Sequence, residues 1–285
     1  MKTIKNDMRV ISSNQEMSQA CREAVKPIGL VPTMGTLHAG HLSLVEQASA
    51  DNLTVVVSIF VNPAQFGDQK DLQAYPRDME GDLNMLRRHG VDLVYAPTVD
   101  EVYPEGFDTW VDVGPLAGKL EGLHRPGHFR GVATVVSKLF NVTRPDRAYF
   151  GQKDGQQTVV IQKLARDLDI GVEVVVMPTI REPDGLAMSS RNVQLTSGQR
   201  FAAPVVYQAL CQAHLLWTGG EKSGDALREA AKNVLEAEPM VDSIDYVSVA
   251  SMTTLDEVEL IDGRVMVSAA ARMGPVRLID NIVLE

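Results

Sequence analysis

The sequence is poor in cysteine: Cys21 and Cys211 are its only two thiols, and they lie far apart in the chain. So few cysteines, in no metal-ligand spacing, exclude a disulfide scaffold and fit a reducing compartment. We interpret both as small core residues. Long hydrophobic runs are also missing, since the longest covers residues 53–61 and includes Thr54 and Ser58. A membrane-spanning helix needs roughly 20 apolar residues, so no membrane span is expected.

Positive charge is scarce as well. The formal net charge is -10, and nonspecific nucleic-acid binding draws its affinity from clustered Lys and Arg. Nucleic acid is therefore not an expected partner, and an anionic substrate needs a locally basic pocket. Residues 1–19 mix charges and amides with scattered apolar residues and lack the continuous hydrophobic region of a secretion signal. We expect a cytoplasmic protein.

Short apolar runs alternate with helical patterns in the first two thirds of the chain. This alternation is typical of βαβ units on a parallel sheet whose strands are covered on both faces. A first helix over 14–24 is expected, with Ser13 or Asn14 as its cap. The expected strands are 28–33, 53–61, 91–96, 147–150 and 172–177, and the expected helices between them are 41–50, 77–89, 132–142 and 156–167.

The pattern of alternating apolar runs and helical segments ends after Pro178. A long polar, turn-rich segment follows, in which Pro183, Asp184 and Gly185 mark the break that we take as an interdomain hinge. Helical spacing over 205–217 and a second helix over 224–236 precede the runs 245–250, 265–271 and 276–279. At 285 residues the chain has room for two domains. The sequence thus predicts an α/β parallel-sheet domain over 1–182 and a smaller α+β domain over 183–285.

The turn after the first long strand carries two glycines and two histidines, in the sequence "VPTMGTLHAGH" from residue 31 to 41. Ligands of open parallel sheets bind outside the carboxyl ends of the strands, and bare backbone at a helix start attracts anions. His38 and His41 are three residues apart, so both rings can face one phosphate. The alternative is that His38 caps a loop and His41 is a surface residue. A zinc site needs further ligands, which the neighbouring sequence lacks.

Two more polar clusters have phosphate-binding chemistry. Gly151, Lys153 and Asp154 follow the strand that ends at Phe150, where a lysine can pair with phosphate and an aspartate can accept from ribose hydroxyls. The segment "AMSSRN", residues 187–192, supplies two hydroxyls and a guanidinium, which suit a departing pyrophosphate. Taken alone, the first could be a solvated loop and the second a turn with a helix cap.

Together these segments resemble one family, the pantothenate synthetases or pantoate-beta-alanine ligases. The matching stretches are "VPTMGTLHAGH" (31–41), "SIFVNPAQF" (58–66), "YPR" (75–77), "RPGHFRGVATVVSKLFN" (125–141), "FGQKDGQQ" (150–157), "AMSSRN" (187–192) and "RLIDN" (277–281). The resemblance implies a Rossmann-like nucleotidyltransferase domain with a C-terminal lid domain, a homodimer, ATP with Mg²⁺, the substrates (R)-pantoate and β-alanine, and a pantoyl-adenylate intermediate.

The resemblance also implies site residues. Gln65 and Gln157 would bind pantoate, with Gln65 also near β-alanine. The implied catalytic residues are His38, His41, Lys153, Ser189, Ser190 and Arg191. The implied ATP-binding residues are Met34, Gly35, Thr36, Leu37, His38, Ala39, Gly40, His41, Gly151, Gln152, Lys153, Asp154, Ile180, Met188, Ser189, Ser190 and Arg191. No residue is assigned as a metal ligand.

The chain departs from the family at Gly155, where members commonly carry an aromatic residue, so the start of the following helix is expected to be looser or its pocket wall differently filled. Gln152 stands where many members have Glu. For Glu121, Arg125, His128 and Arg130 a role beyond loop structure or subunit contact stays open. Two other functions stay open too: another adenylyltransferase of the same superfamily, and a non-catalytic nucleotide-binding protein.

Overall fold

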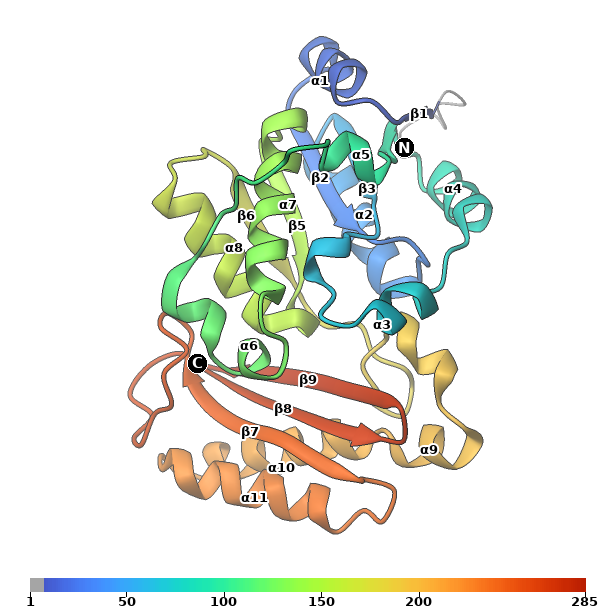
Figure 1. Ribbon diagram of the computed structural model, residues 1–285. Helices are drawn as coiled ribbons and strands as arrows, with labels where there is room; N and C mark the ends of the chain where they lie inside the picture. Colours follow the sequence, from blue (N-terminus) through green and yellow to red (C-terminus); the bar gives the residue numbers. More distant parts are fainter. Residues whose placement is uncertain (1–7) are drawn as a thin grey trace. The chain divides into compact units, whose positions relative to one another are not determined.

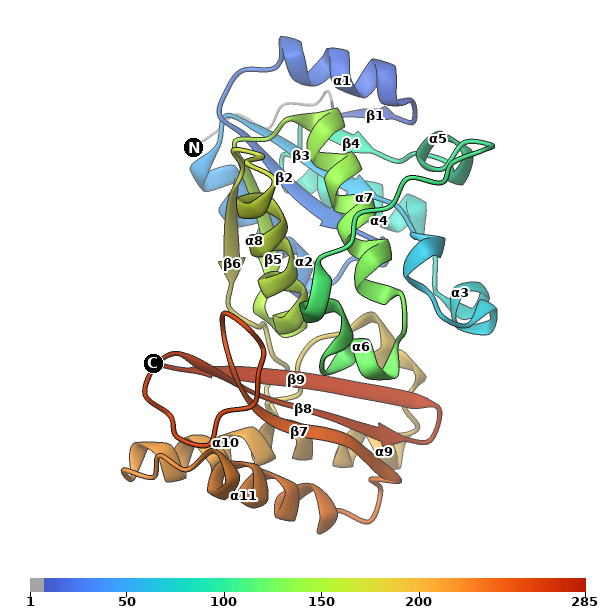
Figure 2. The same cartoon turned by 60° about the vertical axis from the view of Figure 1, so that its left-hand side comes forward.

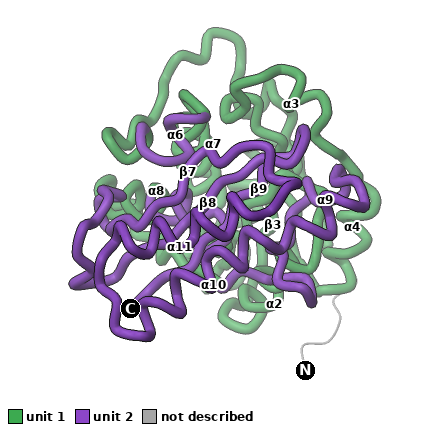
Figure 3. Tube along the Cα trace, turned by 90° about the horizontal axis from the view of Figure 1, so that it is seen from below, with its two compact units in different colours: residues 1–117, 125–151, 160–177 green, residues 118–124, 152–159, 178–285 purple. Residues whose placement is uncertain are grey.

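The computed structural model describes residues 8–285, and Figure 1 traces their helices and strands. The chain forms two compact units, which Figure 3 colours separately. Unit 1 contains the chain up to residue 117 together with 125–151 and 160–177. Unit 2 contains 118–124, 152–159 and 178–285. The boundary expected after residue 182 stays a prediction about domains.

Unit 1 is built on a six-stranded parallel sheet in the order β1-β4-β3-β2-β5-β6. The α/β parallel sheet expected from the apolar runs is therefore confirmed. All six residues of β3 are buried, as expected for a strand covered on both faces. The strands are β1 (Arg9–Ile11), β2 (Ile28–Thr33), β3 (Thr54–Ile59), β4 (Leu93–Tyr95), β5 (Arg147–Gly151) and β6 (Glu173–Met177).

Helices cover both faces of this sheet (Figures 1 and 2). On one face, α2 (Ala39–Asp51) and α4 (Met79–Arg88) bury Val45 and Leu86 in a cluster with Val31, Val57 and Val94 of the strands. The opposite face carries α7 (His128–Thr143), against which α1 (Asn14–Glu23) packs. The remaining helices of this part are α3 (Gln69–Ala74), α5 (Val99–Val102) and α8 (Gly155–Asp167), which runs from unit 2 into unit 1.

The strand order creates a topological switch point between β2 and β5. The chain leaves β2 through α2 toward β3, whereas it leaves β5 through α8 toward β6, on the other side. Loops that depart in opposite directions from neighbouring parallel strands open a crevice at the carboxyl ends of those strands. The turns that begin at Met34 and at Gly151 are therefore where the fold favours a ligand.

Unit 2 is an antiparallel sheet of β7 (Ser243–Ser251), β8 (Val265–Met273) and β9 (Val276–Leu284) with helices on one face. Val267 and Ala269 of β8 pack against Leu210 and Leu227 in one core. The expected two helices and three strands are thus present. The helices are α10 (Val205–Thr218) and α11 (Gly224–Glu236), preceded by α9 (Ser197–Ala202).

The second face of this sheet carries α6 (Glu121–His124) and the first turn of α8. Arg277 of β9 donates to Glu121, and Tyr246 of β7 donates to the same carboxylate at 2.7 Å. The Gln156 side chain accepts from the backbone N–H of Glu121 at 2.9 Å. The segments 118–124 and 152–159 thereby become part of unit 2, although the intervening chain belongs to unit 1.

The two cysteines differ in their surroundings. Cys21 is buried on α1, as predicted, whereas Cys211 is exposed on α10. The prediction that both are core residues is wrong for Cys211, because α10 turns Ala209, Leu210 and Ala213 toward the core and position 211 away from it. Within residues 8–285, no helix has the length and apolarity needed to cross a membrane.

Candidate active site

The turn after β2 has a backbone that few residues adopt. Gly35 has φ of 82° and Thr36 has φ of 53°, so both lie in the left-handed region. The Thr33 hydroxyl donates to the carbonyl of Ser58 at 2.7 Å and accepts from the N–H of Gly35 at 3.2 Å. The turn is thereby tied to the end of β3, directly ahead of α2.

A buried carboxylate holds the same turn from beneath. Asp82 of α4 is 1% exposed, and its two oxygens accept from the backbone N–H groups of Thr36 at 2.8 Å and Leu37 at 2.7 Å. Burial raises the pKa of Asp82 above its usual value, and these N–H donors act in the opposite direction. Sequence reasoning missed Asp82; the signal available was an acidic residue in the first turn of a helix after "YPR".

His38 and His41 form a capping box at the start of α2. The N–H of Gly40 donates to Nδ1 of His38 at 3.1 Å, and the N–H of His38 donates to Nδ1 of His41 at 3.3 Å. A backbone N–H can only donate, so both Nδ1 atoms are acceptors and the neutral rings carry their protons on Nε2. The ring centroids lie 4.1 Å apart. His38 is therefore a helix cap, where the alternative interpretation has it cap a loop, and is also one of two adjacent Nε2–H donors.

Gln65 lies next to this turn within unit 1. It is 8% exposed, and its Nε2 donates to Sδ of Met34 at 3.3 Å. Its Oε1 accepts from Nδ2 of Asn62 at 2.9 Å. The Asn62 amide is oriented by backbone groups, because Oδ1 faces the N–H of Ala64 and Nδ2 faces the carbonyl of Gly131. The resulting chain of bonds leaves Gln65 presenting its NH₂ group on the side of Met34.

The segment 125–130 supports the same residue. The backbone carbonyl of Gln65 lies 2.9 Å from Nδ1 of His128 and accepts from the Arg125 guanidinium at 3.4 Å. Arg130 stacks on Trp110 at 4.7 Å from the ring centroid, in another part of unit 1. In these contacts Arg125 and His128 hold the loop that carries Gln65. Glu121, whose role also stays open, belongs to unit 2.

The second cluster begins at the end of β5. Gly151 closes the strand, and Gln152, Lys153 and Asp154 form a short 3₁₀ turn in unit 2. Lys153 Nζ lies 3.3 Å from Oδ1 of Asp154. In α8, Gln156 is buried against 118–124, whereas Gln157 is half-buried. Of two consecutive glutamines, one is buried and bonded within unit 2, whereas the other stays partly exposed.

The third cluster sits on a hairpin in unit 2. Arg181 and Ala187 form an isolated antiparallel bridge, and the N–H of Met188 donates to the carbonyl of Ile180 at 3.0 Å. The segment 183–185, expected as a hinge, forms the tip of this hairpin. Ser189 then caps a 3₁₀ helix over Ser190–Gln194 by accepting from the N–H of Arg191 at 3.3 Å.

An ion pair holds this hairpin to β9. Arg181 donates to both oxygens of Asp280, with NH2 3.0 Å from Oδ1, and its guanidinium lies 3.7 Å from the centroid of the Tyr207 ring. Burial raises the pKa of Asp280, while Arg181 and the positive charge of Lys153 pull that pKa down. Asp280 therefore lies in the electrostatic field of both Arg181 and Lys153.

The place of the missing side chain at Gly155 is filled by two residues of the antiparallel sheet. A Cβ there would fall 2.4 Å from Sδ of Met266 and 2.9 Å from Cγ of Asn281. Side chains of β8 and β9 therefore fill the space beside Gly155. The expected effect of Gly155 on a pocket wall stays a prediction.

Each unit thus gathers its own share of the expected site residues. Unit 1 brings together Met34, His38, His41 and Gln65, and unit 2 brings together the turns of Lys153 and Arg191 on β9. The convergence of these two sets on one ligand stays a prediction.

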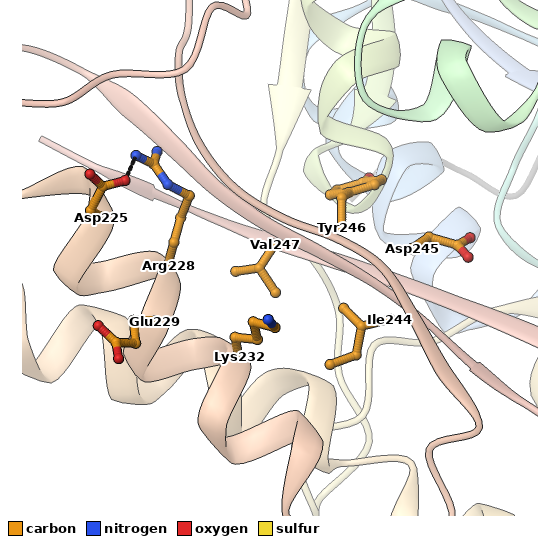
Figure 4. A pocket seen from close by; sticks show the side chains of 8 residues that line it. All are labelled: Asp225, Arg228, Glu229, Lys232, Ile244, Asp245, Tyr246 and Val247. Atoms are coloured by element: carbon orange, nitrogen blue, oxygen red, sulfur yellow. Dashed lines mark hydrogen bonds and ion pairs between the residues drawn. The ribbon is translucent and has the colours of Figure 1, made fainter.

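A separate groove of about 590 Å³ lies in unit 2 between α11 and β7, with Arg228, Lys232 and Tyr246 on its walls (Figure 4). None of the expected site residues lines it.

Metal-binding side chains do not cluster in the described part of the chain: residues 8–285 contain no group of three or more His, Cys, Asp or Glu that could hold an ion. Mg²⁺ is typically held by substrate phosphates, waters and one or two carboxylates.

Comparison with known proteins gives one consistent family. The family model described as pantoate-beta-alanine ligase matches residues 7–283. A pantothenate synthetase of Roseiflexus sp. strain RS-1 is 55% identical over 278 residues, covering 98% of this chain and all of the relative. One from Thermotoga neapolitana is 51% identical over 280 residues, covering 97% of this chain and all of the relative.

Solved structures show the same similarity. A pantothenate synthetase from Thermus thermophilus superposes with a TM-score of 0.92 at 46% identity, covering 96% of this chain and 99% of that one. The pantoate-beta-alanine ligase from Francisella tularensis, solved with Beta-gamma ATP and β-alanine, gives a TM-score of 0.78 at 34% identity and covers 97% of each chain.

Proposed function

Because the chain belongs to the pantoate-beta-alanine ligase family, we propose that the turns after β2 and β5 hold ATP while pantoate is adenylated and then coupled to β-alanine. The protein is an ATP-dependent ligase that condenses pantoate with β-alanine to pantothenate. One observation carries the assignment of the site: the capping box of α2 gives His38 and His41 the same tautomer, with both Nε2–H donors next to a helix N-terminus.

In the first step the pantoate carboxylate attacks the α-phosphorus of ATP. A new bond forms between the carboxylate oxygen and phosphorus, the bond to the bridging oxygen breaks, and pyrophosphate leaves. The carboxylate is already ionised at neutral pH, so this step requires no general base. Positioning and neutralisation of the growing negative charge must supply the rate.

The donors for that charge come from both units. His38 and His41 donate from Nε2 to phosphate oxygens, supported by the backbone of the Met34–His41 turn, including Gly35, Thr36, Leu37, Ala39 and Gly40. Lys153 and Arg191 supply positive charge, and the hydroxyls of Ser189 and Ser190 supply hydrogen bonds to the pyrophosphate as it leaves. Gly151, Gln152, Asp154, Ile180 and Met188 complete the nucleotide site.

Gln65 and Gln157 bind pantoate. The NH₂ group that Gln65 turns toward Met34 suits an acceptor oxygen, and an amide can donate to and accept from hydroxyl groups. Exchange of buried Gln65 for an apolar residue would leave one N–H of the Asn62 amide without its acceptor. Specificity for a small hydroxy acid follows from this paired amide chemistry.

In the second step the amine of β-alanine attacks the carbonyl of pantoyl-adenylate. The amide bond forms, the bond to the adenylate oxygen breaks, AMP leaves and the amine loses a proton. Water must be excluded until then, since hydrolysis would consume the adenylate. We assign that task to the C-terminal α+β part, acting as a lid over the site.

We propose Mg²⁺ as the companion of ATP, a homodimer as the working assembly and the cytoplasm as its location. Mg²⁺ neutralises phosphate charge as a part of the nucleotide substrate. Homodimerisation rests on the family resemblance, and light scattering after size-exclusion chromatography measures it directly. The two cysteines, far apart in the sequence, are both free thiols, which suits a reducing compartment.

The direct test mixes the purified protein with ATP, Mg²⁺, pantoate and β-alanine and follows AMP and pantothenate. Pantoate-dependent ATP–pyrophosphate exchange without β-alanine tests the adenylate step alone. We expect exchange with pantoate, none without it, and one AMP for each pantothenate. Formation of ADP instead of AMP would refute the adenylate route.

A further inference from the structure

The strand β9 carries "RLIDN", residues 277–281, which the reaction outlined above leaves without a role. Asn281 near its centre is 4% exposed. Its Nδ2 donates to the backbone carbonyls of Gln152 at 2.8 Å and Lys153 at 3.0 Å. Its Oδ1 accepts from Nε2 of Gln152 at 2.6 Å. The Asn281 amide thus uses both its N–H donors and its oxygen in hydrogen bonds to a single turn.

The direction of these bonds is dictated by chemistry. Backbone carbonyls can only accept, so only a donor can occupy the position of Nδ2. The turn itself is short and makes only a single 3₁₀ turn over Gln152–Asp154, so little intrinsic structure fixes its carbonyls. By contrast, Asn281 lies in a strand that is paired with β8 over nine residues. A strand with nine paired residues therefore holds a turn that has little regular structure of its own.

Charge acts on the same turn. The Lys153 ammonium lies 3.3 Å from Asp154 and in the attractive field of Asp280, the residue before Asn281. Its side chain is 22% exposed, so this field is only partly screened. The backbone of Lys153 is thus held by Asn281, and its charge is directed by two carboxylates. Bare backbone at Gly155 leaves room for the Asn281 amide, since a Cβ there would lie 2.9 Å from its Oδ1.

We propose that Asn281 is a positioning residue for ATP: it sets the turn from which Lys153 reaches the phosphates, without touching the nucleotide. This inference rests on the proposed function of Lys153. Displacement of a catalytic group by about 1 Å can cost roughly 100-fold in rate, so the bonds from Asn281 matter for catalysis beyond their part in stability.

The test compares Asn281→Asp with Asn281→Ala in the full-length protein. Asp has nearly the same shape but no donor and sets a carboxylate against two carbonyls, whereas Ala removes the amide without adding charge. Asn233→Asp on the exposed side of α11 is the matched control. The readouts are KM for ATP and kcat in pantoate-dependent exchange, with the folded fraction measured by circular dichroism.

We expect both Asn281 variants to raise KM for ATP by about tenfold and to lower kcat by about 10- to 100-fold per folded molecule, and the control to match the parent protein. KM for ATP within about twofold of the parent value, with kcat falling only in proportion to the folded fraction, would reduce Asn281 to a structural residue and overturn the proposal.

Lys153→Ala separates the two claims. An inactive Lys153→Ala together with normal Asn281 variants overturns the positioning role alone. Normal exchange by Lys153→Ala overturns the proposed role of the lysine and, with it, the reason for positioning its turn.

Discussion

The backbone N–H of His38 donates a hydrogen bond to Nδ1 of His41, 3.3 Å away, at the first turn of α2. The bond gives the second ring one tautomer, and the N–H of Gly40 does the same for the first ring. A proton on either Nδ1 would remove the acceptor and break the cap. The site therefore favours two neutral imidazoles that donate from Nε2.

Substitutions that imitate one ring nitrogen at a time test this arrangement. In His41→Asn the amide oxygen can replace Nδ1 as the cap acceptor, but nothing reaches the position of Nε2. In His41→Gln the amide nitrogen can reach that position. We expect Asn to lower kcat of pyrophosphate exchange by about 10²–10³-fold with little loss of stability, and Gln to retain more activity. Exchange near the parent rate in His41→Asn would contradict the role of Nε2.

Asp82→Asn tests the support beneath the turn. An amide can accept from only one of the N–H groups of Thr36 and Leu37 and turns its own NH₂ toward the other. We expect a loss of about 1–3 kcal/mol in the free energy of unfolding, because a buried donor loses its acceptor, and a higher KM for ATP. Urea unfolding measures the first and exchange kinetics the second. Glu80→Gln on the exposed side of the same helix is the control; equal stability of the two variants would show that the Asp82 bonds contribute nothing.

The sequence predicts the parts of this molecule that depend on local pattern. The strand expected over 28–33 is β2 with the same ends, and the polar turn after it lies at the switch point. β1 was missed because it has three residues, two of them exposed, and offers almost no apolar pattern. The motif residues are found on turns, whereas their convergence on one ligand stays a prediction, because no local pattern contains it.

The supporting groups could not be read from the sequence for a different reason. Asp82 lies 45 positions from Leu37, and Asn281 lies 128 positions from Lys153. Both look like ordinary polar residues until tertiary structure removes them from water and gives them backbone partners. Gln65 is similar: its amide is buried, with Asn62 and Met34 as its hydrogen-bond partners.

Consecutive glutamines on α8 should respond differently to truncation. Gln157→Ala should raise KM for pantoate by about tenfold, the cost of roughly one good hydrogen bond, and leave KM for ATP unchanged. Gln156→Ala should mainly lower the melting temperature, since buried Gln156 bonds to Glu121 and Lys119. Steady-state kinetics with each substrate varied and thermal unfolding distinguish the two. An unchanged pantoate requirement in Gln157→Ala would remove Gln157 from the site.

Asp245 gives a pH-dependent test of the ion pairs that it forms with Arg277 and Arg272 in unit 2. Burial alone would raise its pKa, but the guanidinium groups of Arg277 and Arg272 outweigh burial and hold the pKa of Asp245 below its usual value. A lowered folded-state pKa contributes stability that is present above about pH 4 and is lost as pH falls through the folded-state value. The stability difference between the parent protein and Asp245→Asn should therefore shrink as the pH falls below about 4 in urea unfolding. Asp262→Asn, at an exposed position, should show no such trend; a difference that grows with acidification would have the wrong sign for this pairing.

Gly155 is a position in unit 2 where bare backbone is closely enclosed by side chains. An added Cβ would lie 2.4 Å from Met266 Sδ and 2.9 Å from the Asn281 side chain. The thioether can move aside, but Asn281 cannot do so without giving up its bonds to Gln152 and Lys153. We therefore expect Gly155→Ala to cost about 1–3 kcal/mol in the free energy of unfolding and to raise KM for ATP, although alanine favours the helix that begins here. Gly263→Ala, where the added Cβ has nothing within 4 Å, is the matched control. A Gly155→Ala protein more stable than its parent would show that helix propensity outweighs the enclosure, and that the wall formed by Met266 and Asn281 yields easily.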